Sequence, residues 1–192
     1  MENVSTQDVV KHTILRMLLA ACTTVGFGLI FFRLNVFEMG LIASQFLISG
    51  ITSATAYAAL KTPRWRDGLV ALFVWYVVLM FLAGGYNAYL LILYLAYVAG
   101  IAAAVCLYCY FVRKEIVRGV LQRVAAAGVI IAVANALIIL FLGFFNTHAV
   151  AASPGSFAST VFRNLQIGTL IGIGFGLGVE IAEYIIRRTA PV

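Results

Sequence analysis

The sequence predicts an all-α integral membrane protein, a bundle of six transmembrane helices with both termini in the cytoplasm. Hydrophobic residues make up 64% of the 192 residues, charged residues only 10%, and the mean hydropathy is +1.05. A soluble domain carries about 25% charged residues, so this chain has too little polar surface to cover itself in water. Six apolar runs, each close to the ~20 residues that cross a bilayer core, account for most of the chain.

The six runs follow one another along the chain with short polar connections between them. The glycine pair in the connection at residues 84–87 predicts a tight hairpin, so the third and fourth helices should be antiparallel neighbours. Strands of a β-barrel would be shorter and would alternate polar with apolar residues, which these runs do not. The length fits one domain, 1–192, without an added soluble domain. The expected spans are residues 13–32, 39–60, 68–83, 89–112, 120–145 and 160–186.

Basic residues predict the orientation of the bundle. The side opposite the chain ends holds only Arg33 and Arg163, whereas the side with both ends holds the other basic residues. Cytoplasmic loops carry the excess of Lys and Arg, so both ends should be cytoplasmic, in what we expect to be a bacterial inner (plasma) membrane. The even number of spans agrees with this orientation. The basic residues on that side are Lys11, Arg16, Lys61, Arg64, Arg66, Arg113, Lys114, Arg118, Arg123, Arg187 and Arg188.

The chemistry-bearing residues favour no enzyme, metal site or cofactor. Cys106 and Cys109 have redox spacing and share a helical face, but a catalytic pair needs an accessible, electropositive thiolate, and these thiols lie in an apolar helix. The sequence has no four Cys or His residues with ligand spacing, and no Ser/His/Asp set at a membrane surface. The net charge of +6 sits in short clusters beside the apolar runs, which argues against a nucleic-acid partner.

The sixth run is unusually rich in glycine. Small residues four apart let helices approach closely, and in lipid such packing replaces the hydrophobic drive between helices. We expect these glycines to pack helices within the bundle. A smooth wall for a ligand and a contact between protomers of a homo-oligomer are the alternatives. The five glycines are Gly168, Gly172, Gly174, Gly176 and Gly178.

Four polar residues are the expected ligand contacts, namely Gln45, Asn135, Gln166 and Glu180. Glu180 lies on the order of 10 Å inside the cytoplasmic end of its helix, at 1.5 Å per residue, and a carboxylate in the membrane is a functional-site hypothesis by default. It would bind a lipid head group or couple a proton, and an ion pair with Arg16 or Arg123 is the alternative. Glu183 should be a surface residue. The amides of Gln45 and Asn135 need partners, so each lines a cavity or bonds a neighbouring helix.

One segment also resembles a known family. From residue 153 to 178 the chain has Ser153-Pro154, Phe162-Arg163-Asn164 and then a helix with Gly174 and Gly178. Looser matches are Arg16 early in the first helix and Phe111-Val112-Arg113 after the fourth. In these features, and in its six-helix outline with both ends cytoplasmic, the chain resembles Insig, the family of membrane sterol-sensing regulators.

The resemblance implies a prokaryotic member of that family with a lipid pocket inside the bundle. Two positions depart from the family pattern. Val112 stands where the family has the aspartate that holds its membrane protein partner, and residues 84–87 replace an acidic outer connection. The contact with a protein partner is therefore the part of the resemblance that these residues support least.

Together these features predict a non-enzymatic protein that binds a lipid, sterol- or diacylglycerol-like, as a sensor or regulatory scaffold. Apolar tails would lie between helices, with a head group near the cytoplasmic end of the sixth helix. The alternative is a small-solute transporter or a substrate-capture subunit, which predicts a polar pocket around Gln45, Asn135 and Glu180 and often broken helices. No proline falls inside the six runs. A third class is a purely structural oligomer subunit without a pocket.

Overall fold

A computed structural model describes residues 6–31, 39–61, 65–82, 88–145 and 157–189. Within these ranges all the regular elements are helices, so the expectation of an all-helical chain with six helices is confirmed for the described residues. The helices are α1 (Thr6–Phe31), α2 (Met39–Lys61), α3 (Trp65–Leu82), α4 (Ala88–Arg113), α5 (Val120–Phe145) and α7 (Phe157–Thr189).

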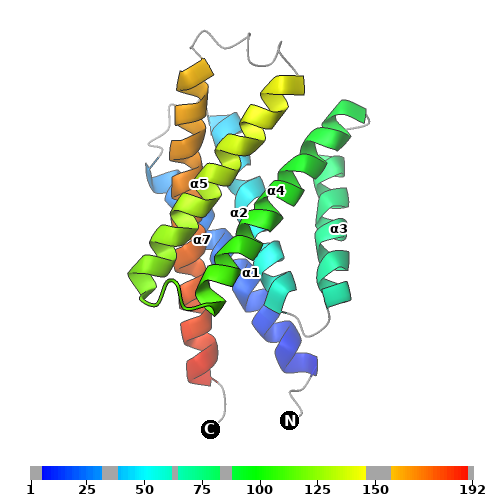
Figure 1. The fold of residues 1–192 in the computed structure, drawn as a ribbon. Helices are drawn as coiled ribbons and strands as arrows, with labels where there is room; N and C mark the ends of the chain where they lie inside the picture. The colour runs from blue at the N-terminus through cyan, green and yellow to red at the C-terminus, as the bar shows by residue number, and fades with distance from the viewer. Residues whose placement is uncertain (1–5, 32–38, 62–64, 83–87, 146–156, 190–192) are drawn as a thin grey trace.

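The helices extend past several of the apolar runs. α1 begins at Thr6 rather than at residue 13, and α7 ends at Thr189 rather than at residue 186. Hydropathy marks only the part of a helix suited to lipid, whereas the backbone hydrogen bonds continue into polar sequence. At 1.5 Å per residue, α7 is about 50 Å long and exceeds a bilayer core of ~30 Å. The connection at 84–87 lies outside the described residues, but α3 and α4 contact each other and run in opposite directions (Figure 1).

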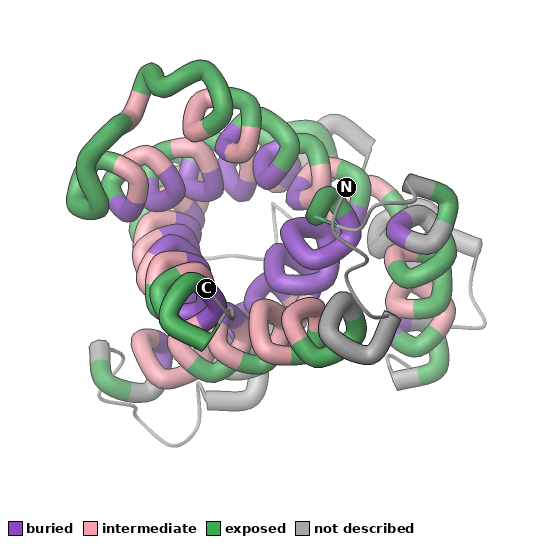
Figure 2. Tube along the Cα trace, turned by 90° about the horizontal axis from the view of Figure 1, so that it is seen from below, coloured by how far each residue is buried: buried purple, intermediate pink, exposed green. Residues whose placement is uncertain are grey.

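Five helices form a closed ring. α7 contacts α1 and α5, α1 contacts α2, α2 contacts α4, and α4 contacts α5. Figure 2, seen along the bundle, shows this ring with buried residues turned inward. α3 lies outside the ring against α2 and α4 (Figure 1). α1 begins and α7 ends at the same end of the bundle, which we call the basic end because Lys11, Lys61, Arg113 and Arg187 lie there.

Glycines let α7 approach two neighbours closely. A Cβ on Gly168 would lie 2.7 Å from the Cα of Ala132, and a Cβ on Gly174 would lie 2.7 Å from the Cα of Thr24. Backbone atoms cannot yield at such distances, so a side chain at either position would push the helices apart. The five glycines therefore face helices of the same chain. Gly168, Gly172 and Gly176 face α5, whereas Gly174 and Gly178 face α1.

Polar side chains in the bundle connect neighbouring helices. The Asn135 amide donates to the backbone oxygen of Asn164 at 3.2 Å and links α5 to α7. The indole of Trp75 donates to the hydroxyl of Thr52 at 2.8 Å and ties α3 to α2. In an apolar surrounding an unbonded polar group is costly, so these contacts fix how the helices are rotated against one another.

A left-handed turn ends α4 and fixes the position of its last residue, Arg113. Glu115 has a φ of 55°, and the Ile116 amide donates to the Phe111 carbonyl at 3.1 Å. The Glu115 amide donates to the carbonyl of Val112 at the same distance. This pair of bonds is the Schellman pattern, which satisfies the last carbonyls of the helix. It stops α4 at the basic end of the bundle.

Three helices are long and apolar enough to cross a membrane, counting only the residues that the structure describes. α3 adds a shorter apolar segment, Val70–Leu79. Large apolar side chains also cover the outside of the bundle, with Leu121 82% exposed and Phe81 71% exposed. Both features are compatible with an integral membrane protein. The three segments are Leu95–Arg113, Val120–Phe141 and Ala158–Thr189.

Candidate ligand site at the basic end of the bundle

The last turns of α7 place two carboxylates and a guanidinium on one helical face. Glu180, Glu183 and Arg187 are three and then four residues apart, the spacing at which side chains meet on a helix. The glycine-lined part of α7 precedes them, so α1 and α5 already lie close on either side where the charges begin. Each carboxylate consequently faces a different neighbouring helix.

Glu180 pairs with Arg123 of α5. The Arg123 Nη2 donates to Oε2 at 2.8 Å, and Nε lies 2.7 Å from Oε1, so both carboxylate oxygens face the guanidinium. The two side chains are 20% and 16% exposed. This is the ion-pair alternative expected for Glu180, with Arg123 rather than Arg16 as the partner.

Glu183 pairs with Arg16 of α1 and also accepts a hydrogen bond from α2. The Arg16 Nε donates to Oε1 at 2.9 Å, and Nη2 donates to Oε2 at 3.5 Å. The Tyr57 hydroxyl donates to the same Oε1 at 2.9 Å. The expectation that Glu183 is a surface residue is wrong, because its side chain is only 18% exposed and joins three helices. Hydropathy could not show this, since the partners lie 167 and 126 residues away.

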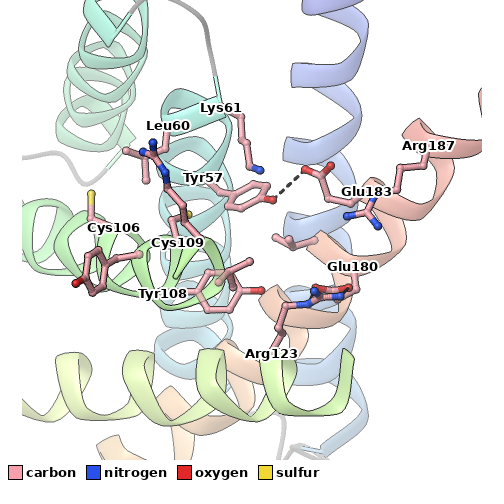
Figure 3. A pocket seen from close by; sticks show the side chains of 14 residues that line it. Tyr57, Leu60, Lys61, Cys106, Tyr108, Cys109, Arg123, Glu180, Glu183 and Arg187 are labelled. Atoms are coloured by element: carbon pink, nitrogen blue, oxygen red, sulfur yellow. Dashed lines mark hydrogen bonds and ion pairs between the residues drawn. The ribbon is translucent and has the colours of Figure 1, made fainter. Parts of the chain in front are cut away.

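A cavity of about 490 Å³ opens between α2, α4, α5 and α7 beside these two ion pairs (Figure 3). Its size falls within the range of small-molecule sites in proteins. It is lined by Tyr57, Leu60, Lys61, Cys106, Tyr108, Cys109, Tyr110, Val112, Arg113, Arg123, Val179, Glu180, Glu183 and Arg187.

Two buried tyrosines form the inner wall of the cavity, and both pack edge-on against Phe175. The ring centroids of Tyr57 and Phe175 are 5.9 Å apart at 77°, and those of Tyr108 and Phe175 are 5.7 Å apart at 73°. Their hydroxyls differ. Tyr57 donates to Glu183, whereas the Tyr108 hydroxyl has no hydrogen-bond partner in the described part of the chain, although the residue is only 1% exposed. Figure 3 shows this hydroxyl pointing into the cavity.

The lining carries more positive than negative charge. Four cations (Lys61, Arg113, Arg123 and Arg187) stand against two carboxylates, and each carboxylate already has an arginine partner. Lys61 also lies above the Tyr57 ring, with Nζ 5.6 Å from the centroid. Within the described ranges, Lys61, Arg113 and Arg187 have no carboxylate within ion-pair distance. The site therefore favours an anion.

A second cavity, of about 360 Å³, also borders the Arg123–Glu180 pair and lies between α5 and α7. It shares Arg123, Glu180, Glu183 and Arg187 with the first cavity. Its other lining residues are apolar or aromatic and face outward, with Val120 54%, Ile181 43% and Tyr184 55% exposed. A cavity with charged side chains in its lining thus adjoins an outward-facing, mainly apolar groove, and four charged residues border both. The remaining lining residue of the groove is Leu177.

Of the three expected ligand residues whose side chains the structure describes, only one lines this cavity. Glu180 lines it. Asn135 is 3% exposed and bonds α7 instead, which is the helix-to-helix alternative, and Gln166 is exposed; neither lines either cavity. The Gln45 side chain lies outside the described residues. Polarity alone predicted Gln45, Asn135 and Gln166 as ligand contacts. Polarity does not report the direction in which a helix residue faces.

Sequence reasoning did not predict that five further residues belong to one site. They are Tyr57, Lys61, Tyr108, Arg113 and Arg187. Some local signal existed, because Tyr57 and Lys61 are four residues apart and Glu180, Glu183 and Arg187 share a face. The convergence of four helices on one cavity had no local signal. Cys106 and Cys109 are free thiols that also line it, and no three His, Cys, Asp or Glu side chains among the described residues converge to hold a metal ion.

Comparisons with protein-family models, with curated proteins and with solved structures gave no match. The chemistry of the site is therefore read from its own residues. Paired carboxylates, unpaired cations and an unused hydroxyl can bind and orient an anionic group.

Proposed function

We propose that this protein crosses the membrane with all six helices, keeps both termini in the cytoplasm and binds a membrane lipid without catalysing a reaction. Its orientation is supported by charge, because α2, α4 and α7 each end in basic residues at the basic end, whereas Arg163 lies near the start of α7. The positive-inside rule assigns the basic end to the cytoplasm. A bacterial inner membrane is the proposed location.

The observation that carries the proposal is the adjacency of the two cavities. A lipid has a polar head and an apolar tail, and here a cavity of about 490 Å³ that holds four cations and two carboxylates adjoins a mainly apolar groove of about 360 Å³. The head group would occupy the first cavity, and a tail would leave through the groove between α5 and α7 toward the bilayer. Binding of this kind depends on shape and burial and needs no catalytic group.

The resemblance to Insig adds a regulatory role to this proposal, in which the lipid-loaded bundle acts as a sensor or scaffold for a membrane protein partner or for a second copy of itself. The transporter alternative has less support. Transporters often place their substrate at broken helices, whereas each of the six helices is continuous within its bounds.

Native mass spectrometry of the purified full chain tests lipid binding. We expect one lipid per chain for the natural sequence and a large loss of bound lipid in Leu60→Trp, because Leu60 lines the cavity and is 47% exposed, so an indole there fills space without disturbing the core. Leu121→Trp is the matched control, because Leu121 is 82% exposed and lines neither cavity. A chain that carries no lipid, or equal lipid in both variants, would refute the proposal.

A further inference from the structure

Three cations and one tyrosine hydroxyl around the first cavity have no acidic partner among the described residues. Lys61 ends α2, Arg113 ends α4 and Arg187 lies in the last turn of α7, so three helices each bring one positive charge to the same cavity. The hydroxyl belongs to Tyr108 on α4, and Figure 3 shows it directed into the cavity toward the Arg123–Glu180 pair.

Both carboxylates of the cavity already have an arginine partner. Glu180 is engaged by Arg123 at 2.7 and 2.8 Å, and Glu183 is engaged by Arg16 and Tyr57 at 2.9 Å. The cavity therefore presents three charges beyond its internal ion pairs. Like charges that face one cavity repel one another, and a bound anion would relieve that repulsion.

The Tyr108 hydroxyl is an independent sign of a ligand. It belongs to a residue that is only 1% exposed and lines the cavity, and it has no hydrogen-bond partner among the described residues. The neighbouring Tyr57 packs on the same Phe175 ring, and its hydroxyl donates a hydrogen bond to Glu183. An acceptor atom inside the cavity would complete the bonding of Tyr108.

The arrangement of donors fits a phosphate monoester better than a neutral or singly charged group. A phosphate monoester offers three terminal acceptor oxygens and close to two negative charges. The donors come from three different helices, so a ligand must present oxygens in several directions to reach them. A hydroxyl head group, as in a sterol or a diacylglycerol, would leave the cations without a counter-ion.

Resting on the lipid binding proposed above, we propose that the cavity selects the phosphate monoester head group of a membrane lipid through Lys61, Arg113, Arg187 and the Tyr108 hydroxyl. The neighbouring groove between α5 and α7, which shares four lining residues with the cavity, favours a lipid over a free phosphate compound. In this arrangement the tail passes the Arg123–Glu180 pair, which borders both cavities.

The test compares lipids that share acyl chains and differ only in the head. The full chain in phosphatidylcholine nanodiscs is titrated with dioleoyl phosphatidic acid, with dioleoylglycerol and with soluble glycerol 3-phosphate, and bound ligand is counted by native mass spectrometry. We expect phosphatidic acid to bind at least tenfold more tightly than the other two. Neutralising Lys61→Gln, Arg113→Gln or Arg187→Gln should weaken phosphatidic acid binding about fivefold each.

Matched variants separate a built site from general attraction to basic residues. Arg118→Gln removes one basic charge from the loop after α4, where the side chain is 80% exposed and outside the cavity, and should leave affinity unchanged. Tyr108→Phe should weaken phosphatidic acid binding about tenfold and leave dioleoylglycerol unaffected. We expect both variants to fold like the natural sequence, and monodisperse elution checks this.

Each other outcome overturns a defined part of the proposal. Equal binding of phosphatidic acid and dioleoylglycerol would overturn the head-group selection and leave lipid binding standing. Equal losses in Arg118→Gln and Arg113→Gln would reduce the site to nonspecific surface charge. Glycerol 3-phosphate that binds as tightly as phosphatidic acid would overturn the lipid as the source of the phosphate. The absence of any binding would overturn the proposed function itself.

Discussion

An arginine–glutamate pair holds α7 on each of its two sides at the basic end, and the surroundings of the two pairs differ. On the α1 side, Glu183 receives Arg16 and a third donor, Tyr57. On the α5 side, Glu180 receives Arg123 alone among the described residues, and both members of this pair border both cavities, whereas on the α1 side Glu183 borders them and Arg16 does not. The two pairs are equally buried within a few per cent, with side chains between 14% and 20% exposed.

The difference separates a pair with one member outside the ligand site from a pair that lies wholly in its wall. A carboxylate with three donors on two helices fixes the position of α7 against α1 and α2. A two-membered pair between two cavities can exchange a partner when an anion enters, because its donors and acceptors face the ligand space. The glycines follow the same division, since Gly178 packs α7 on α1 and Gly172 packs it on α5.

Substitution of either packing glycine should give the largest loss of stability. A Cβ on Gly172 would lie 2.6 Å from the Cα of Gly128, and a Cβ on Gly178 would lie 2.6 Å from the Cα of Ala20. We expect Gly172→Ala and Gly178→Ala each to lower the free energy of unfolding in mixed micelles by about 3 kcal/mol. Gly26→Ala, the control, should cause no loss.

A Cβ on Gly26 would meet no heavy atom within 4 Å, so this substitution changes helix propensity alone. If Gly172→Ala unfolds at the same denaturant concentration as Gly26→Ala, the close approach of α7 to α5 is not what stabilises the bundle.

Neutralisation of the two carboxylates should lower the free energy of unfolding by different amounts on the two sides of α7. Glu183→Gln removes a charged acceptor from three hydrogen bonds and should lower the free energy of unfolding by about 2 kcal/mol. Glu180→Gln should lower it by about 1 kcal/mol, because Glu180 has Arg123 as its one partner among the described residues. Glu115→Gln is the control, since the side chain is 74% exposed and 3.9 Å from Arg118. Equal losses at Glu180 and Glu183 would contradict the division.

Removal of the two tyrosine hydroxyls should have the smallest effects on the free energy of unfolding, with a loss at Tyr57 and none at Tyr108. Tyr57→Phe loses a hydrogen bond to a charged acceptor and should cost about 1.5 kcal/mol in the free energy of unfolding. Tyr108→Phe should cost nothing, because its hydroxyl donates to no described residue, and both variants keep their edge contact with Phe175. Thermal unfolding of the two purified variants side by side measures the contrast, and a loss in Tyr108→Phe equal to that in Tyr57→Phe would mean that Tyr108 has a structural partner.

Part of the site is predictable from the sequence. Glu180 stands out as the unusual carboxylate of the last helix, and Arg123 is one of its two expected partners. The glycines of that helix are expected to pack within the bundle, and they face α5 and α1. Asn135 cannot be assigned between a cavity and a neighbouring helix from sequence, because the choice depends on the rotation of α5, which the bond to Asn164 reveals.

The sequence by itself determined six helices and the end at which basic residues gather, because apolar runs and charge clusters are local properties that each segment carries alone. Only the tertiary structure decided that Arg16 meets Glu183, that Arg123 meets Glu180, and that Lys61, Arg113 and Arg187 surround one cavity. These contacts join residues on different helices. Their formation depends on which faces pack together, and the close approach of α7 to α1 and α5 at glycine sets those faces.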